Sequence, residues 1–131
     1  MFVDASAIIA IMAGEPEQPA LRDKLNAANP VLVSPVTVYE ATLGFARILQ
    51  GNLAISATGV QNFITATKAR VVPIDDAIGA LALDAFRQYG RGRHRAGLNM
   101  GDCFAYACAK FHRVPLLFKG DDFGHTDITA A

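Results

Sequence analysis

Carboxylic acids stand at four places in this chain where the surrounding residues are mostly apolar. The acids are Asp4, Glu40, Asp102 and the adjacent pair Asp121 and Asp122. A buried carboxylate without a partner costs several kcal/mol or stays protonated. Carboxylates that gather at one place therefore need a cation, and oxygen ligands suit Mg²⁺ or Mn²⁺. The first hypothesis is a divalent-metal site whose bound water attacks phosphorus and hydrolyses a phosphodiester.

Glu40 carries the sharpest of these signals. Its neighbours at three and four residues along a helix form an apolar or small stripe that should face the core, made of Val36, Thr37, Leu43 and Gly44. A structural alternative is an ion pair with Arg47.

The other acids have structural alternatives as well. Asp4 can cap the helix that follows it, and Asp102 can be the third helical residue of a capping box begun by Asn99. Asp121 and Asp122 are residue types that are common in turns. The metal hypothesis is favoured over these structural alternatives. Several of the alternatives would have to be true together, and the four acidic positions would have to lie at the same edge of the sheet by chance.

The regular elements expected from the sequence place the acids together. Strands are expected at Phe2–Asp4, Val31–Val33, Val71–Ile74 and Pro115–Phe118, with a short fifth considered at Thr126–Ile128. Helices are expected over 5–13, 17–28, 35–50, 53–69, 75–89 and 99–113. This alternation predicts an α/β fold, a three-layer sandwich with a short, mostly parallel central sheet flanked by helices. Ligands of such sheets bind at the carboxyl ends of the strands, where all four acidic positions are expected to converge.

A basic loop supplies attraction for a polyanion. Arg91, Arg93 and Arg95 lie within five residues on a glycine-flanked loop just before the helix of Asp102. With Lys119 they would neutralise about three phosphates of single-stranded RNA and give a salt slope near minus two, about 0.7 per phosphate. The alternative is a solvated connecting loop.

Composition sets the limits of the interpretation. A chain of 131 residues predicts one domain over 1–131, and 52% hydrophobic with 18% charged residues excludes a disordered chain. The formal net charge is zero, so any nucleic-acid binding has to come from a local basic patch. No signal peptide or membrane-spanning run is evident, and a soluble cytoplasmic protein is expected.

Four motifs in order give a resemblance that covers the whole length. They are Met-Phe-Val-Asp-Ala-Ser-Ala at the start, Val-Tyr-Glu-Ala, Asn-Met-Gly-Asp-Cys-Phe-Ala-Tyr-Ala, and Leu-Leu-Phe-Lys-Gly-Asp-Asp-Phe followed by Thr-Asp-Ile. In this order and at these spacings, the chain resembles PIN-domain ribonucleases, and more closely the VapC-type toxins of type II toxin-antitoxin pairs. One departure is Ala5, where the family often has Thr.

The resemblance implies an acidic set made of Asp4, Glu40, Asp102 and a fourth acid, for which Asp121 is preferred and Asp122 is the alternate. All are expected to serve Mg²⁺ or Mn²⁺, with Ser6 orienting Asp4 or joining the metal shell. It also implies an RNA substrate, a homodimer and a cognate VapB-type antitoxin whose C-terminal segment covers the acidic groove. The apolar helices between Pro16 and Ala69 are candidates for those protein contacts.

Two rival interpretations belong to other classes. An aspartyl-phosphate phosphohydrolase also has an Asp after its first strand, but it needs a second Asp two residues later, where this chain has Ser6. A catalytically silent interaction module has no reason to keep four costly carboxylates at one edge. The endoribonuclease hypothesis is therefore preferred.

Overall fold

Short strands alternate with longer helices throughout residues 1–131, all of which the computed structural model describes. The strands are β1 (Phe2–Val3), β2 (Leu32–Val33), β3 (Arg70–Val71) and β4 (Leu116–Leu117). The helices are α1 (Ala5–Ala13), α2 (Gln18–Asn26), α3 (Pro35–Ile48), α4 (Leu53–Ala66), α5 (Asp76–Tyr89) and α6 (Met100–His112). A 3-10 turn, η1 (Asp122–His125), follows β4.

None of the helices combines the length and apolar character needed to cross a membrane.

The strands form a parallel sheet in the order β3-β2-β1-β4. The register pairs Phe2 with Leu32 on one side and with Leu116 on the other. Successive side chains of a strand point to opposite faces. In β1, β2 and β4 the first residue packs with α5 and α6, and the second packs with α1 to α4. Both faces of the sheet are thus buried, which explains why these strands are apolar at every position.

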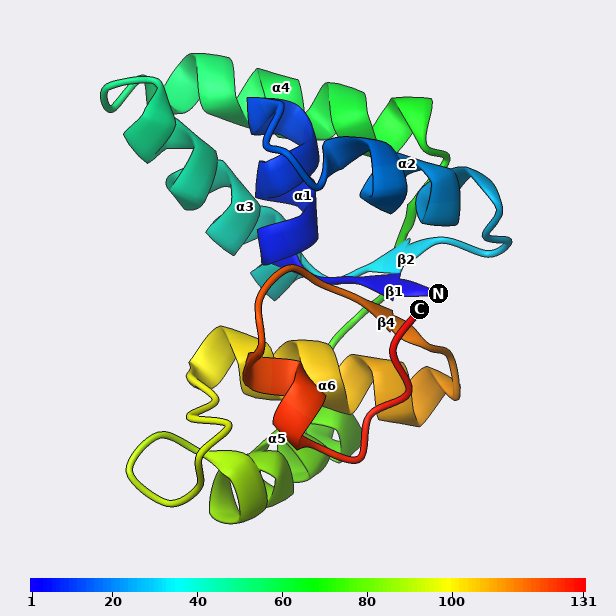
Figure 1. The fold of residues 1–131 in the computed structure, drawn as a ribbon, viewed down its shortest axis with the longest axis vertical. Helices are drawn as coiled ribbons and strands as arrows, with labels where there is room; N and C mark the ends of the chain where they lie inside the picture. Colours follow the sequence, from blue (N-terminus) through cyan, green and yellow to red (C-terminus); the bar gives the residue numbers. More distant parts are fainter.

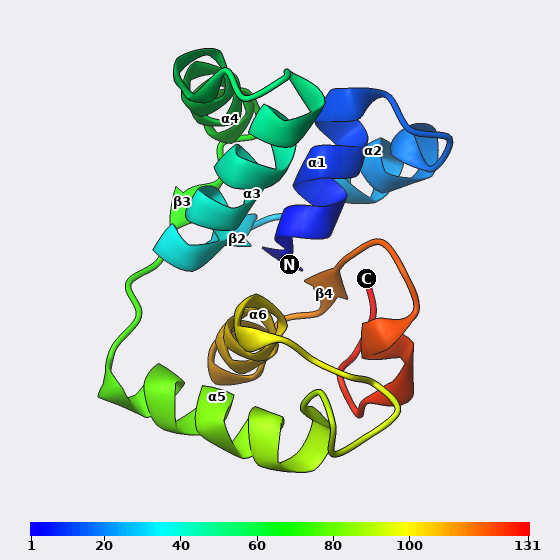
Figure 2. The same cartoon turned by 90° about the vertical axis from the view of Figure 1, so that its left-hand side faces the viewer.

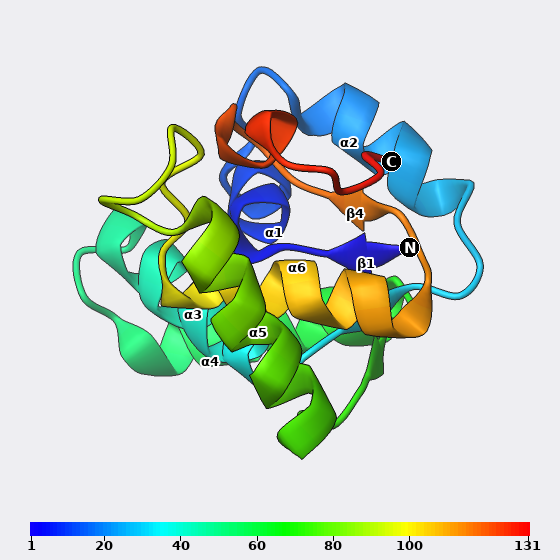
Figure 3. The same cartoon turned by 90° about the horizontal axis from the view of Figure 1, so that it is seen from below.

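The molecule has three layers. In Figure 1, α1 to α4 lie above the sheet, and α5, α6 and η1 lie below it. Seen from below, α5 lies across α6 (Figure 3). The C-terminal segment returns to the sheet through a single bridge between Ala130 and Leu116. The α/β sandwich expected from the sequence is confirmed.

All the α-helices except α2 begin at a residue whose side chain caps them. Ser34 caps α3 by accepting a hydrogen bond from the backbone N–H of Thr37 (3.2 Å), and Pro35 takes the first helical position. Asp75 caps α5 in the same way, with the N–H of Ile78 at 3.0 Å. Such side-chain caps satisfy the N–H groups that a helix leaves free at its start.

Two strand predictions are wrong. The third strand is Arg70–Val71 and not Val71–Ile74, because Pro73 has no N–H to continue the ladder. No strand forms at Thr126–Ile128. There the Thr126 hydroxyl accepts a hydrogen bond from the N–H of Ile128 (3.2 Å) and donates one to the carbonyl of Phe123 (2.8 Å). These local bonds compete with strand pairing.

Candidate active site

The predicted acids come from four elements that meet at the carboxyl ends of the strands. Asp4 follows β1, Glu40 lies in the second turn of α3 after β2, Asp102 lies in the first turn of α6, and the acidic pair follows β4. Figure 2 looks onto this edge of the sheet, with the starts of α1, α3 and α6 around the end of β4. Residues separated by up to 118 positions in the chain are brought together in this way.

Asp4 is the most deeply buried acid, with 4% of its surface exposed. Its Oδ2 accepts hydrogen bonds from the backbone N–H (2.9 Å) and the hydroxyl (2.5 Å) of Ser6. The Ser6 hydroxyl in turn accepts a bond from the backbone N–H of Lys119 (3.0 Å). Ser6 therefore locks Asp4 in orientation and ties the start of α1 to the segment after β4. Burial raises the pKa of Asp4 in spite of these bonds.

Asp102 closes a capping box at the start of α6. Its Oδ2 accepts the N–H of Asn99 (2.9 Å), while the Asn99 side chain accepts the N–H of Asp102 (3.0 Å). The capping role considered from the sequence is therefore real, but it engages one carboxylate oxygen only. Burial and the charges of Asp4 and Asp122 raise the pKa of Asp102 to about 6, although the bond from Asn99 and the charge of Arg91 act in the other direction.

Glu40 is half-buried and makes no ion pair; the pairing with Arg47 considered from the sequence does not form. Burial, followed by the charges of Asp4 and Asp102, raises its pKa to about 7. Glu40 is thus electrostatically coupled to both aspartates. No lysine or arginine side chain contributes to the shift.

Asp121 and Asp122, the two adjacent aspartates after β4, have different neighbours. Asp122 lies close enough to raise the pKa of Asp102, whereas Asp121 has no such effect. Asp121 instead lines a hollow against α2, together with Glu17 and Lys119. The charge of Asp122 acts on Asp102 and that of Asp121 does not, which favours Asp122 over the sequence-based preference for Asp121.

The basic residues predicted to bind RNA divide into two groups. Arg91, Arg93 and Arg95 are exposed on a loop whose base is closed by backbone bonds between Arg91 and Leu98 and between Leu98 and Tyr89. Arg93 lies over the ring of Phe86, 5.5 Å from its centroid. Lys119, by contrast, is held in ion pairs with Glu15 and Glu17, the latter at 3.3 Å. Its charge is already balanced, so the structure does not favour a phosphate-binding role for Lys119.

The carboxylates suit a hard divalent cation in their chemistry. They supply only oxygen donors, and their mutual repulsion is what a cation would relieve. As the side chains stand, however, no three Asp, Glu, His or Cys side chains are close enough to hold one ion. Coordination by Asp4, Glu40 and Asp102 would therefore require their carboxylates to move closer together.

A glycine at the centre of this site has no counterpart among the predicted residues. Gly101 is buried in the first turn of α6, and the Glu40 carboxylate occupies the place where a Cβ on this residue would lie. One signal in the sequence was a glycine inside a predicted helix, which weakens the helix and so calls for a packing or functional reason.

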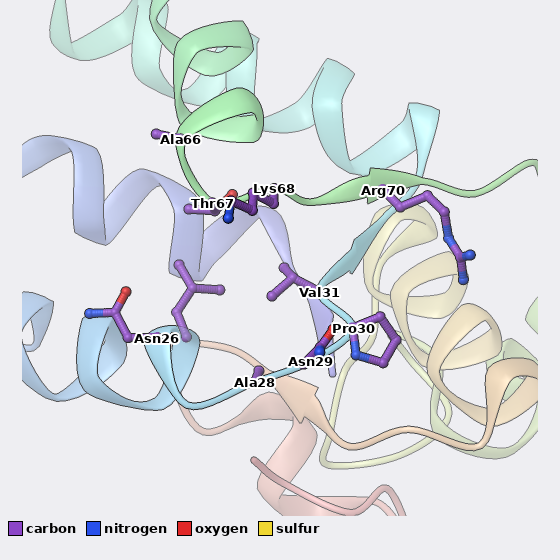
Figure 4. Close-up of a pocket in the computed structure, with 10 residues that line it drawn as sticks. Asn26, Ala28, Asn29, Pro30, Val31, Ala66, Thr67, Lys68 and Arg70 are labelled. Carbon is purple, nitrogen blue, oxygen red and sulfur yellow. The ribbon is translucent and has the colours of Figure 1, made fainter.

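The largest hollow in the surface lies away from the acids. It has a volume of about 620 Å³ and opens at the amino ends of β2 and β3, where α2 and α4 end (Figure 4). Its lining includes Lys68 and Arg70 but no carboxylate. It continues along α4 into two further hollows of about 410 and 390 Å³. This region has no groups for acid-catalysed or metal-dependent chemistry.

Comparisons with known proteins identify the family of this chain and its fold. The model of the PIN domain matches residues 1–128. A VapC ribonuclease of Rhizobium meliloti (strain 1021) is 40% identical, and the alignment covers 97% of this chain and 98% of that protein. Ribonuclease VapC30 of Mycobacterium tuberculosis (strain ATCC 25618 / H37Rv) is 39% identical, with 98% and 95% covered.

Solved structures share the fold at lower sequence identity. The VapC20 toxin of Mycobacterium tuberculosis, described as cleaving the sarcin-ricin loop, superimposes with a TM-score of 0.78 at 16% identity, over 99% of this chain and 97% of that one. A toxin-antitoxin complex from Klebsiella pneumoniae has a chain that superimposes with a TM-score of 0.69 at 20% identity, over 99% and 95%.

Proposed function

This chain belongs to the PIN-domain family and is related to its VapC ribonucleases over nearly its whole length, and we propose that it is a metal-dependent endoribonuclease toxin with a cognate antitoxin. The observation that carries the proposal is the acidic centre, defined as Asp4, Glu40, Asp102 and Asp122. Three of these carboxylates have raised pKa values, each with burial as the largest cause. Such a cluster is unfavourable in isolation and gains stability when a cation joins it.

Asp4 and Asp102 are the principal ligands in this proposal, with Glu40 and Asp122 beside them. A bound Mg²⁺ or Mn²⁺ supplies a lowered pKa for its water and stabilises the charge that develops on the phosphate oxygens. Ser6 keeps Asp4 in place by its two hydrogen bonds. Without metal, burial and the charges of Asp4 and Asp102 raise the pKa of Glu40 to about 7, and a bound cation would favour its ionised form. Arg91, Arg93 and Arg95 attract the RNA backbone.

Replacement of Asp4 by asparagine tests the proposal most directly. Asp4→Asn keeps the size of the side chain and one oxygen for the Ser6 bonds but removes the charge. Cleavage of single-stranded RNA in Mg²⁺ or Mn²⁺ should fall by more than about 100-fold, since even the partners of metal ligands cost about 10- to 100-fold when removed. Undiminished cleavage by the purified variant would sink the site assignment.

Asp84→Asn is the matched control for this test. Asp84 is exposed on α5 and is paired with Arg87 at 3.0 Å, outside the acidic centre. Its replacement should leave both cleavage and Mn²⁺ binding, measured by calorimetry, unchanged. Sequencing the RNA ends made on induced expression of the wild type beside Asp4→Asn would identify the target RNA and the bond that is cut.

We also propose a surface for the antitoxin. The hollows along α4 form an α2–α4 groove, lined by Ile11 and Phe63 as apolar residues and by Arg22, Lys68 and Arg70 as cations, with no carboxylate in the lining. An apolar segment flanked by acidic residues would complement this groove in shape and charge. A further antitoxin segment would have to reach around to cover the acidic centre.

Substitution within the groove distinguishes antitoxin binding from catalysis. Ala66→Arg places a long side chain in the hollow, since Ala66 is exposed and lines two of its sections. Affinity for the cognate antitoxin should fall at least about tenfold, as expected when a well-packed contact worth over about 1.4 kcal/mol is lost. Cleavage should stay unchanged. Ala57→Arg is the control, because Ala57 is exposed on α4 but lies outside the α2–α4 groove; equal loss by both variants would contradict the assignment.

A homodimer completes the proposal. Leu83 and Met100 are 65% and 64% exposed, and with Phe86 they line one hollow between α5 and α6. Exposed large apolar groups that lie together mark interaction surfaces. Leu83→Glu should shift the sedimentation coefficient from that of a dimer to that of a monomer, and an unchanged coefficient would argue against this surface.

A further inference from the structure

Gly101 is the second residue of α6, between Met100 and Asp102, and it is buried. Its φ lies outside the left-handed region, so the backbone conformation itself does not call for glycine. Alanine would strengthen the helix at this position. The reason for a glycine must therefore lie in what surrounds it.

The surroundings of Gly101 differ from those of every other glycine in the chain. A Cβ built on Gly101 would collide with the carboxylate carbon and both carboxylate oxygens of Glu40. Gly44, one turn beyond Glu40 on α3, would meet only the side chain of Ile9, and Gly79 on α5 would meet nothing within 4 Å. Only at Gly101 does the missing side chain leave room for an acidic residue of the site.

We propose that Gly101 is a positioning residue, whose missing side chain is the space through which Glu40 reaches Asp4 and Asp102. The catalytic part of this inference rests on the proposed ribonuclease function, whereas the steric part does not. Any side chain at position 101 would displace the Glu40 carboxylate from the place where it now acts on Asp4 and Asp102. Gly101 touches no reacting atom in this account and acts through Glu40 alone.

A double-mutant cycle tests whether Gly101 acts through Glu40. Gly101→Ala should lower RNA cleavage about 100-fold, the loss that a displacement of about 1 Å can cause in a catalytic group. On a Glu40→Ala background there is no carboxylate to displace, so Gly101→Ala should add no further loss. Equal losses on both backgrounds would overturn the proposal. Gly79→Ala, the matched glycine-to-alanine change on an open helix face, should leave cleavage unchanged.

Thermal unfolding of the same variants, without metal, tests the steric contact separately. Gly101→Ala should change Tm by different amounts on the two backgrounds, because the Glu40 carboxylate has to move only where it is present, whereas on the Glu40→Ala background only the gain in helix propensity remains. An equal change of Tm on both backgrounds would overturn the contact. Calorimetric titration with Mn²⁺ adds a readout that needs no RNA, in which Gly101→Ala should bind more weakly than Gly79→Ala.

Failure of the two proposals can be told apart. If the wild type does not cleave RNA, the proposed function fails, and the Tm cycle still decides whether Gly101 makes room for Glu40. If the wild type cleaves RNA and Gly101→Ala cleaves equally well with unweakened Mn²⁺ binding, the proposed function stands and the positioning role of Gly101 is refuted.

Discussion

The pKa of Asp127 is lowered, whereas the pKa values of the acids in the acidic centre are raised, although both groups of acids lie beside α6. Asp127, in the C-terminal segment, accepts hydrogen bonds from Lys110 (2.8 Å) and the Tyr106 hydroxyl (2.5 Å), which lower its pKa. In the acidic centre, burial and like charges raise the pKa values of Glu40 and Asp102. The charge of Asp127 is balanced by Lys110, whereas Glu40 and Asp102 form no ion pair within the chain.

The difference separates a structural acid from acids kept for function. Asp127 fastens the C-terminal segment to α6, and its charge is stabilised by the residues that it holds. Burial disfavours the ionised forms of Asp4, Glu40 and Asp102, and like charges add to this for Glu40 and Asp102, so these acids cost stability when no cation is bound. In the proposed function, a bound divalent cation would balance these charges.

Alanine substitution should have its largest and most different effects on RNA cleavage when Asp102 is compared with Asp127. Asp102→Ala should lower metal-dependent RNA cleavage by more than about 100-fold, the upper range for residues that merely support metal ligands. Asp127→Ala should leave cleavage within about threefold and lower the free energy of unfolding by about 1 kcal/mol, as expected for a partly exposed charged pair. Cleavage assays and urea unfolding of both variants measure this. Comparable losses of cleavage would show that the two regions are not functionally distinct.

Substitution of the two adjacent aspartates after β4 tests which of them belongs to the acidic centre. Asp122→Asn should lower cleavage about tenfold, the smaller of the losses seen for groups around a metal site, because its charge acts on Asp102. Asp121→Asn should have little effect, since Asp121 lies against α2. The ratio of kcat/KM values for the two variants decides which aspartate is the fourth acid. A larger loss for Asp121→Asn would favour Asp121, the residue preferred from the sequence.

The cations allow a similar comparison between free and paired charges. Replacing Arg91, Arg93 and Arg95 together by glutamine should make the slope of log affinity against log salt shallower by about 2, at about 0.7 per phosphate contact on single-stranded RNA. Lys119→Gln should hardly change that slope, because Glu15 and Glu17 already pair with Lys119. Binding of uncleavable RNA at several salt concentrations gives the slopes. If the triple replacement leaves both affinity and slope unchanged, the loop is only a solvated connector.

The smallest expected effect is on stability against pH. The pKa of Glu40 is raised from 4.5 to about 7 and that of Asp102 from 3.8 to about 6, so the folded chain keeps protons that the unfolded chain has released. Stability without metal should therefore fall as pH rises through this window. Glu40→Gln should flatten the fall between pH about 6 and 7, and Mn²⁺ should stabilise the protein more at higher pH. Urea midpoints from about pH 5 to 8 in EDTA test the sign, and a rise would contradict it.

Much of the fold could be predicted because its causes are local. Ser34 before Pro35, Asp75 before a helical stripe and Asn99 three residues before Asp102 each specify a helix start within a few residues. The strands were harder to predict, since each has only two residues and Pro73 stops the third. A short apolar run does not by itself indicate how many of its N–H groups will find partners in the sheet.

The convergence of the acids followed from topology and needed no distances. Parallel strands end at one edge, and the helices that leave that edge start there, so the sequence by itself predicted that Asp4, Glu40, Asp102 and one of two adjacent aspartates should gather, and what class of chemistry they would suit. Only the tertiary structure decided the details. It placed Asp122 where its charge raises the pKa of Asp102, paired Lys119 with Glu15 across 104 residues, and set Gly101 against Glu40. These outcomes depend on side-chain directions and on contacts between distant segments, and neither is specified by the local sequence pattern.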